Sequence, residues 1–343
     1  MDIIQVLNTI RDNASAEYQA RIPEATRTNM EDIRFAMIDG ENVQVANEFM
    51  NTILNKLVKS VVHNKMFTNP LKALKKGNKP LGDTVEEIYQ NFIKGDVYDP
   101  EGINLLGRKL PDTKTVYHRM NYKQKYKVTV SREELSKAFK SPENLEAYIK
   151  TIINALYNSA ELDEFMNMKQ LIKSAVEKNA VVVKEITNPL ESDVAGKEFI
   201  KTVKTVSGLM SFPSTEWNGY LTAQSRDKKA ITTFSRKSEQ VLILDTATDT
   251  SVSVDVLASL FNMSVAEFND TKKIVIDVFP DTTKGTIYGA LVDEAFFQIF
   301  DDLYTIASFR NGEGLYDNYY LHVWQTLAFS ILVNAVVFVV PEA

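Results

Sequence analysis

The sequence contains no cysteine among its 343 residues. This absence excludes disulfide bridges, thiolate zinc sites and a cysteine nucleophile. Histidine is scarce as well, because only His63, His118 and His322 occur and they are far apart in the sequence. A metal site built on histidines is therefore not expected.

Features of an exported or membrane-inserted protein are also missing. The first residues lack a basic segment followed by a long apolar run, so no secretory signal is predicted. The longest run without ionisable residues, Val323–Val340, contains several polar residues and ends in β-branched ones. This pattern favours a buried strand over a membrane span. With 44% hydrophobic and 10% aromatic residues, the chain can bury a sizeable core.

Sequence signatures of common enzymes are absent too. There is no GxxxxGKS/T or GxGxxG phosphate-binding motif, no HExxH zinc motif and no GxSxG nucleophile motif. Two carboxylate pairs, Asp293-Glu294 and Asp301-Asp302, are the remaining candidates for hydrolytic or metal-dependent chemistry. On one helix Asp293 and Asp301 would share a face, but no histidine or third ligand is near. Solvated helix ends are the favoured interpretation of both pairs.

Neither sign of charge is in large excess, since 39 Lys and Arg residues oppose 45 Asp and Glu residues for a net charge of −6. The distribution is uneven, however. Lys56–Lys140 holds 18 basic and 9 acidic residues and carries +9, while the rest holds 21 basic and 36 acidic residues and carries −15. This separation suggests a partner, and the acidic majority argues against a dedicated nucleic-acid reader.

The first third of the chain divides into a helical part and a turn-rich part. Residues 1–70 are predicted to be helical, and Val45, Phe49, Ile53 and Leu57 share one helix face. A helix packed in the core and an arm lying on a neighbouring subunit both fit this pattern. Residues 71–113 are rich in turn formers, and an excursion of this length in a compact domain is unusual unless it has a purpose.

A basic strand of unusual length follows. From Thr115 to Ser131 the residues alternate with period two, which predicts a strand of about 50 Å at about 3.3 Å per residue. One face is basic, and no acidic residue occurs between Asp112 and Glu133. Three interpretations fit: nucleic-acid binding, a solvated face that discourages edge pairing, and contact with an acidic patch on another copy. The acidic remainder of the chain favours the third.

A long helix and an α+β half complete the chain. Ser141-Pro142 predicts a helix start, and apolar residues at helical spacing continue to about Lys178, which gives a helix of roughly 50–55 Å. Further helices are expected at Asp193–Met210, Val254–Phe261 and Asp293–Leu303. Strands are expected at Val241–Asp245, Ile274–Phe279, Thr286–Val292 and Ile331–Val340. Asn311-Gly312 predicts a turn between Tyr304–Arg310 and Tyr316–Trp324.

Three of these patterns, in this order, resemble the major capsid proteins of tailed bacteriophages, in particular small phages with short tails. The first is the basic strand that runs through VTVSREEL (Val128–Leu135) into the long helix, and the second is the α+β half. The third is the closing segment. Its parts FQIFD (Phe297–Asp301) and NGEGLYDNYYLHVW (Asn311–Trp324) are similar to an aromatic helix and a hairpin near the ends of those proteins.

The resemblance implies an α+β fold of the tailed-phage major capsid type. Its expected parts are an N-terminal arm, an extended hairpin called the E-loop, a long spine helix, and peripheral and axial domains. The expected boundaries are 1–70 for the arm, 71–131 for the E-loop and long strand, 132–190 for the peripheral domain with the spine helix, and 191–343 for the axial domain. The C-terminal strands are expected to return to the peripheral domain.

The resemblance also implies a function without catalysis. The chain is expected to self-assemble through pentamers and hexamers into the icosahedral phage head, which encloses double-stranded DNA. Expected partners are further copies, a separate scaffolding protein, a portal protein and non-specifically contacted DNA; no membrane, cofactor or metal is expected. The expected interface residues on the E-loop strand are Tyr117, Arg119, Tyr122, Lys123, Lys125 and Lys127. Alternatives are an encapsulin-type shell around an enzyme cargo, and a carboxylate-dependent hydrolase or nuclease built on Asp293 and Asp301.

Overall fold

The computed structural model describes residues 3–38, 45, 48–49, 67–79, 84–98, 100, 102, 106–223, 230–251 and 272–341. The chain divides into two compact units. The first unit comprises Met1–Asn69, Tyr122–Glu164 and Asp302–Trp324, and the second comprises Pro70–Asn121, Phe165–Asp301 and Gln325–Ala343. Three elements have residues in both units: helix α6 (Pro142–Glu177) and strands β9 (Phe297–Asn311) and β10 (Tyr316–Phe329).

The first unit packs helices and strands around one core. Its other elements are α1 (Ile3–Asp12), α2 (Ala16–Arg21), α3 (Met30–Ile38), β4 (Tyr122–Ser131) and α5 (Arg132–Ala138). The core joins the N-terminal helices to the strands, because Ile10, Val45, Phe49 and Tyr319 are buried in the same cluster. In the described residues the N-terminal region is therefore packed in the core of its own chain, while Ile53 and Leu57 lie outside the described residues.

Helix α6 confirms the predicted long helix almost to the residue. The Ser141 hydroxyl accepts a hydrogen bond from the Asn144 amide at 3.2 Å and so caps the helix. Lys150 pairs with Glu146 at 2.5 Å, one turn earlier. The predicted apolar stripe is buried along the whole length of the helix: Leu145, Ile149, Ile152, Leu156, Ala160, Phe165, Ile172 and Val176.

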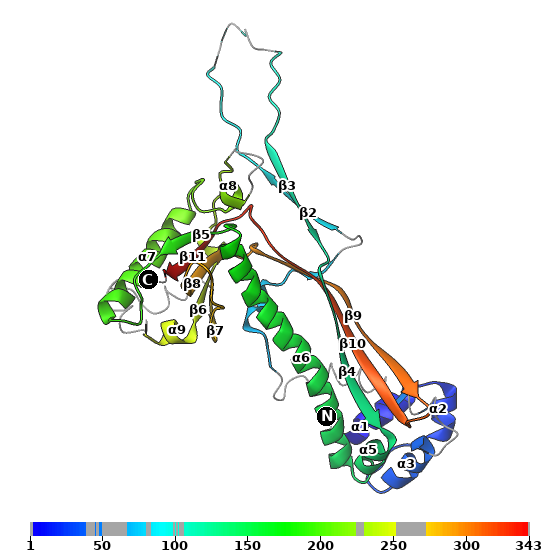
Figure 1. Cartoon of the computed structure of the whole chain (residues 1–343). Coiled ribbons are helices and arrows are strands. Elements are labelled where there is room, and N and C mark those ends of the chain that lie inside the picture. The colour runs from blue at the N-terminus through cyan, green and yellow to red at the C-terminus, as the bar shows by residue number, and fades with distance from the viewer. Residues whose placement is uncertain are drawn as a thin grey trace. The chain divides into compact units, whose positions relative to one another are not determined.

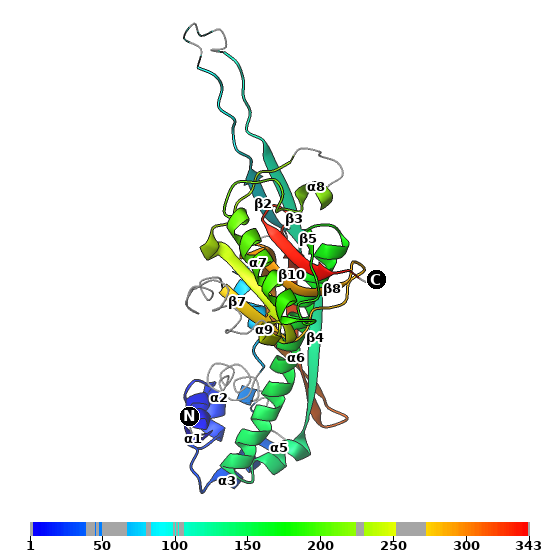
Figure 2. The same ribbon diagram turned by 90° about the vertical axis from the view of Figure 1, so that its left-hand side faces the viewer.

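The second unit is built on a five-stranded sheet of order β5-β11-β8-β6-β7. These strands are β5 (Val182–Glu185), β6 (Gln240–Asp245), β7 (Lys272–Ile276), β8 (Thr286–Asp293) and β11 (Ala335–Val340). The pairs β11–β5 and β6–β7 are parallel, whereas β8 is antiparallel to both of its neighbours. Helix α7 (Asp193–Met210), predicted with these bounds, covers one face of the sheet through Phe199 and Val203 (Figure 2).

Smaller elements complete the second unit. They are η1 (Pro70–Leu74), β1 (Gly77–Asn78), α8 (Tyr220–Ala223), η2 (Lys237–Glu239) and α9 (Thr246–Ser251). Strand β1 pairs with β9 at one edge of a second sheet of order β1-β9-β10-β4. Helix α9 is not among the elements predicted from the sequence, and the helix expected at Val254–Phe261 lies outside the described residues.

The expected E-loop is present as a hairpin of β2 (Thr84–Gln90) and β3 (Thr113–Arg119). The two strands are antiparallel, with Thr84 opposite Arg119 and Gln90 opposite Thr113. Residues 91–98 and 106–112 continue the strands as two extended legs (Figure 1). We use the name E-loop for residues 84–119.

The prediction of one continuous strand from Thr115 to Ser131 is wrong, because the chain leaves the β-ladder at Met120 and Asn121. At this point the side-chain amide of Asn121 makes the hydrogen bonds that backbone groups make within a β-ladder. Its Nδ2 donates to the Leu327 carbonyl at 2.8 Å, and its Oδ1 accepts from the Leu327 amide at 2.8 Å. The period-two alternation persists on both sides of the break, which is why the sequence pattern did not reveal it.

The prediction of a helix over Asp293–Leu303 is also wrong. Residues 294–296 form a turn, and Phe297 begins the 15-residue strand β9, which forms a hairpin with β10 at the predicted Asn311-Gly312 turn. The segment from Phe297 is rich in aromatic and β-branched residues, which suit a strand. The remaining strand predictions hold with shifted ends: β11 starts at Ala335 instead of Ile331, and β7 ends at Ile276 instead of Phe279.

Candidate subunit interface

Three of the predicted interface residues lie on one solvent-facing side of β4. Lys123, Lys125 and Lys127 are exposed at alternate positions, and the neighbouring Tyr122 and Tyr126 are half-buried. Strand β10 lies next to β4 and completes this face with aromatic side chains. The Lys123 ammonium lies 4.6 Å from the centre of the Trp324 ring, and the Lys125 ammonium lies 5.9 Å from that of Tyr320. We call these five residues the lysine–aromatic face, which combines positive charge with flat apolar surface.

Tyr122, also predicted at the interface, points the other way. It is half-buried and packs against the core of the first unit. Its hydroxyl lies 3.2 Å from that of Tyr126, which donates to the Asp163 carboxylate at 2.7 Å. Burial, together with these two partners, raises the pKa of Tyr126 far above its usual value. Tyr122 therefore supports β4 from behind and is not presented on the lysine–aromatic face.

The remaining two predicted residues belong to the E-loop in the second unit. Tyr117 is 61% exposed, and its hydroxyl donates to the Glu86 carboxylate on the opposite strand at 3.1 Å. Arg119 is exposed at the end of β3, where it pairs in register with Thr84. The six predicted residues thus occupy three places: the lysine–aromatic face, the core side of β4, and the E-loop.

Sequence reasoning missed the apolar surface of the E-loop itself. Besides Tyr117, seven large hydrophobic side chains are exposed in the part of the E-loop that the structure describes: Ile88, Phe92, Ile93, Val97, Tyr98, Leu106 and Leu110. Val97 and Leu106 are 95% and 92% exposed, so they contribute almost nothing to the core of their own subunit. Large exposed apolar surface on a soluble protein is typical of a binding interface. The available signal was the number of large hydrophobic residues spread through a segment rich in turn formers.

The two carboxylates considered for catalysis are held by structural partners on different strands. Asp293 ends β8, where it accepts hydrogen bonds from the Ser235 hydroxyl and from the Ala295 amide at 2.8 Å. Burial raises the pKa of Asp293, against the lowering effect of these bonds. Asp301, on β9, pairs with Lys75 at 2.8 Å and accepts from the Gln325 amide at 2.9 Å. The shared helix face on which the hydrolase alternative depended does not exist.

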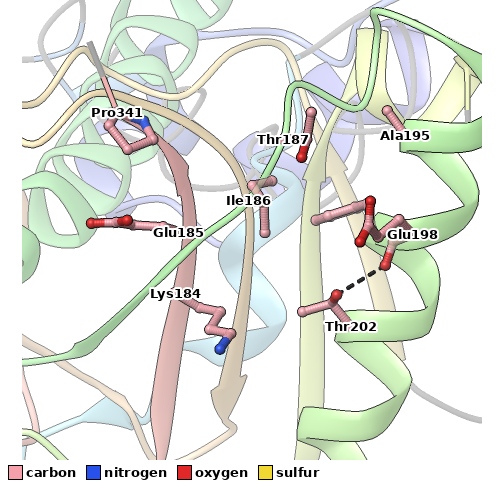
Figure 3. A pocket seen from close by; sticks show the side chains of 9 residues that line it. Lys184, Glu185, Ile186, Thr187, Ala195, Glu198, Thr202 and Pro341 are labelled. Atoms are coloured by element: carbon pink, nitrogen blue, oxygen red, sulfur yellow. Dashed lines mark hydrogen bonds between the residues drawn. The ribbon is translucent and has the colours of Figure 1, made fainter. Parts of the chain in front are cut away.

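A pocket of about 400 Å³ lies in the second unit between β5 and α7. Figure 3 shows Lys184 and Glu185 on the strand side and Glu198 and Thr202 on the helix side. The Thr202 hydroxyl donates to the Glu198 backbone carbonyl at 2.9 Å, as is usual within a helix. The lining contains no histidine. Among the described residues, no group of three or more His, Asp or Glu side chains could hold a metal, and no helix could span a membrane.

Sequences of known proteins match most of this chain. A family model described as the Phi29-like phage major capsid protein matches residues 7–339. The major capsid protein of Bacillus phage PZA is 35% identical over 338 residues, which cover 97% of this chain and 72% of the relative. That of Bacillus phage B103 is 33% identical over 341 residues, covering 98% of this chain and 73% of the relative.

A solved structure agrees with these sequence relatives. A chain in the capsid structure of Staphylococcus phage Andhra superposes with a TM-score of 0.65 at 13% identity, over 81% of this chain and 86% of that one. Its likeness supports the fold, which is that of the capsid proteins of tailed phages. The chain belongs to the Phi29-like phage major capsid protein family. It is a non-enzymatic structural component of the virion head. Membership of this family decides against the encapsulin and hydrolase alternatives.

Proposed function

We propose that this capsid subunit assembles through pentamers and hexamers into an icosahedral head that encloses double-stranded DNA. The exposed apolar E-loop is the observation that carries the proposal. Within a ring, each subunit must present one surface and receive a different one, because a heterologous contact closes by rotation. An exposed hairpin and a separate lysine–aromatic face supply two such different surfaces.

The interface residues retain the roles expected from the sequence, with one change. Tyr117 and Arg119 on the E-loop, and Lys123, Lys125 and Lys127 on the lysine–aromatic face, contact the adjacent subunit. Tyr122 acts through Tyr126 and the core behind β4. Charged contacts of this kind select the partner and the register, while the apolar E-loop residues contribute most of the buried area.

The two units provide a basis for the domain assignment. In the proposed assignment most of the peripheral domain falls in the first unit and most of the axial domain in the second, although residues 165–190, expected in the peripheral domain, belong to the second unit and residues 302–324, expected in the axial domain, belong to the first. Scaffolding and portal proteins are proposed as further partners because a closed shell with a DNA entrance requires a size template and one distinct vertex. The packaged DNA is contacted weakly and without sequence preference, in keeping with the net charge of −6.

The test replaces Val97, Leu106 and Leu110 together by serine. All three side chains are more than 80% exposed, so the isolated subunit is expected to keep its circular dichroism spectrum and melting temperature. Negative-stain electron microscopy and sedimentation velocity are expected to show subunits or small oligomers instead of closed shells. A matched control replaces Val194 and Leu209 in α7, and Phe212 two residues after it, by serine; all three side chains are exposed. Normal shells from the E-loop variant would contradict the proposal.

A further inference from the structure

Strand β2 of the E-loop has two distinct faces. Its even-numbered residues from Thr84 to Gln90 are exposed, whereas Val85, Glu87 and Tyr89, and Asn91 directly after the strand, are half-buried. Three of the half-buried residues are polar and lie two residues apart: Glu87, Tyr89 and Asn91. Polar side chains in half-buried positions carry a desolvation cost unless they are hydrogen-bonded. The hydrogen-bond partners of these three side chains therefore show which parts of the second unit this face of the hairpin contacts.

Glu87 connects β2 to β3 and to the segment after β10. One carboxylate oxygen lies 2.9 Å from the His118 Nε2 atom on β3. The other oxygen accepts a hydrogen bond from the Ser330 hydroxyl, and Ser330 is completely buried. Through this carboxylate, the base of the hairpin is joined to a residue more than 240 positions further along the chain.

Tyr89 and Asn91 make a second connection, to residues 230–234. The Tyr89 hydroxyl donates to the Thr232 carbonyl. Asn91 Nδ2 donates to the Ala230 carbonyl at 3.1 Å, and its Oδ1 accepts from the Thr232 amide at 3.1 Å. Phe92 extends the connection, because its ring stacks on that of Phe234 with 6.4 Å between their centres.

Asn91 also joins the two legs of the hairpin. Its backbone amide donates to the Asp112 carbonyl at 2.9 Å, at the point where the β2–β3 ladder ends. The same residue therefore holds the legs together and binds them to residues 230–232. Hydrogen bonds have preferred directions, so several of them on one strand face define an orientation better than apolar contact does. Water can replace each of them, so the connection can open without loss of the core.

We propose that Glu87, Tyr89 and Asn91 are positioning residues that fix the direction in which the E-loop leaves the second unit. The proposal rests on the proposed function, in which the E-loop contacts a neighbouring subunit. An E-loop held in one direction loses less conformational freedom when it binds the neighbouring subunit than an E-loop that moves freely. If only a fraction of subunits hold the E-loop in the competent direction, the apparent affinity for the neighbour equals the intrinsic affinity multiplied by that fraction.

Direction can be measured in the isolated subunit by electron paramagnetic resonance, because the chain has no cysteine of its own. Spin labels are placed at Thr115→Cys on β3 and Lys237→Cys on η2, both exposed residues of the second unit. The unaltered background is expected to give one narrow distance distribution. Adding Asn91→Ala with Tyr89→Phe is expected to broaden it. The matched control, Gln90→Ala, alters an exposed residue on the other face of β2 and is expected to leave the distribution unchanged.

Assembly is measured on the same variants without labels. The Asn91→Ala, Tyr89→Phe variant is expected to need roughly tenfold more protein to form closed shells, if about one arm in ten keeps the competent direction. An unchanged distance distribution would overturn the positioning role. A broadened distribution with normal shells would overturn its importance for assembly. If the double variant does not fold, Tyr89→Phe alone removes one hydrogen bond with little change in shape and provides the same two measurements.

The two proposals can fail separately. If the serine variant at Val97, Leu106 and Leu110 assembles normally, the E-loop is not a subunit contact and the proposed function fails. The distance measurement on the Asn91 variant would still report whether the polar face of β2 orients the hairpin. If the serine variant fails to assemble while the Asn91 variant behaves like its Gln90 control, only the positioning role is lost.

Discussion

Lys123 holds its ammonium group 4.6 Å from the centre of the Trp324 ring, so the charge of β4 and an aromatic side chain of β10 form one surface. A cation over an exposed aromatic ring contributes about 0.5–1 kcal/mol. Neighbouring Lys125 repeats the arrangement more loosely over Tyr320. The basic strand is therefore a preorganised part of the sheet surface instead of a row of freely moving charges.

Replacing Lys123, Lys125 and Lys127 together by glutamate tests whether this surface receives a neighbour. We expect folded, soluble subunits that lose about 1 kcal/mol of stability through the two cation–π contacts and fail to form shells. Sedimentation velocity measures assembly, and urea denaturation measures stability. A charge-matched control reverses Lys178, Lys201 and Lys237, which are exposed elsewhere. Shell formation by the first variant at the level of the second would contradict charge complementarity at this face.

The Lys169–Asp277 pair gives a prediction of pH dependence within the second unit. Lys169 is 4% exposed and donates to both carboxylate oxygens of Asp277, at 2.7 and 2.9 Å. Although burial acts to raise it, the hydrogen bonds from Lys169 lower the pKa of Asp277. Asp277→Asn leaves a buried ammonium without its carboxylate, so we expect a loss of about 1–2 kcal/mol, limited because Asp277 is more than half exposed.

The sign of the pH effect follows from the lowered folded-state pKa. The stabilisation by Asp277 is present above the ordinary aspartate pKa of about 3.9 and is lost as the pH falls through the lower folded value. The difference in the free energy of unfolding between wild type and Asp277→Asn is therefore expected to be fully present at pH 6–7. It is expected to shrink below about pH 4. Denaturation curves at several pH values measure it, with exposed Asp281→Asn as the control. A difference that grows on acidification would be the opposite of this expectation.

Substitution of Ile10 tests whether the N-terminal helices are part of the hydrophobic core. Its side chain is completely buried in the same cluster as Phe139 and Tyr319. Ile10→Ala is expected to cost about 2–4 kcal/mol, the range for a large-to-small change at a buried site. Gln5→Ala, on the exposed side of the same helix, is expected to change stability by less than about 0.5 kcal/mol. Equal effects of the two substitutions in denaturant titrations would mean that α1 does not contribute to the core.

Gly285 is expected to tolerate no side chain. Its φ angle is +119°, and a Cβ atom would lie 2.1 Å from the Val340 carbonyl oxygen. Gly285→Ala therefore combines a strained backbone with a clash against β11, and we expect a loss of about 2–3 kcal/mol. Gly312→Ala is the matched control, because open space surrounds that position. Thermal melts compare the two, and similar melting temperatures would contradict the expected strain.

Local signals in the sequence predicted the elements whose cause is local. Helix α7 was predicted with its observed bounds because apolar residues recur at helical spacing between Ser192, which caps it, and Met210. The exposed lysines of β4 followed from period-two alternation. Both patterns depend only on residues a few positions apart, so the sequence carries them directly.

Features that depend on distant residues could not be predicted in this way. The break at Asn121 is made by bonds to Leu327, 206 positions away. Strand β9 depends on its pairing with β10 and β1, which overrides the helical interpretation of Asp293–Leu303. The polar face of β2 depends on Thr232 and Ser330, and nothing in the local sequence of the E-loop names these partners.

The position of β11 has a consequence for how the protein is made. This strand, Ala335–Val340, lies in the interior of the five-stranded sheet, between β5 and β8. During translation, β5, β6 and β8 leave the ribosome before their missing neighbour, so a nascent chain cannot complete the sheet until residue 340 has emerged. Domains generally fold as units in the order of synthesis. A subunit on the ribosome can therefore acquire an assembly-competent second unit only after β11 has been translated.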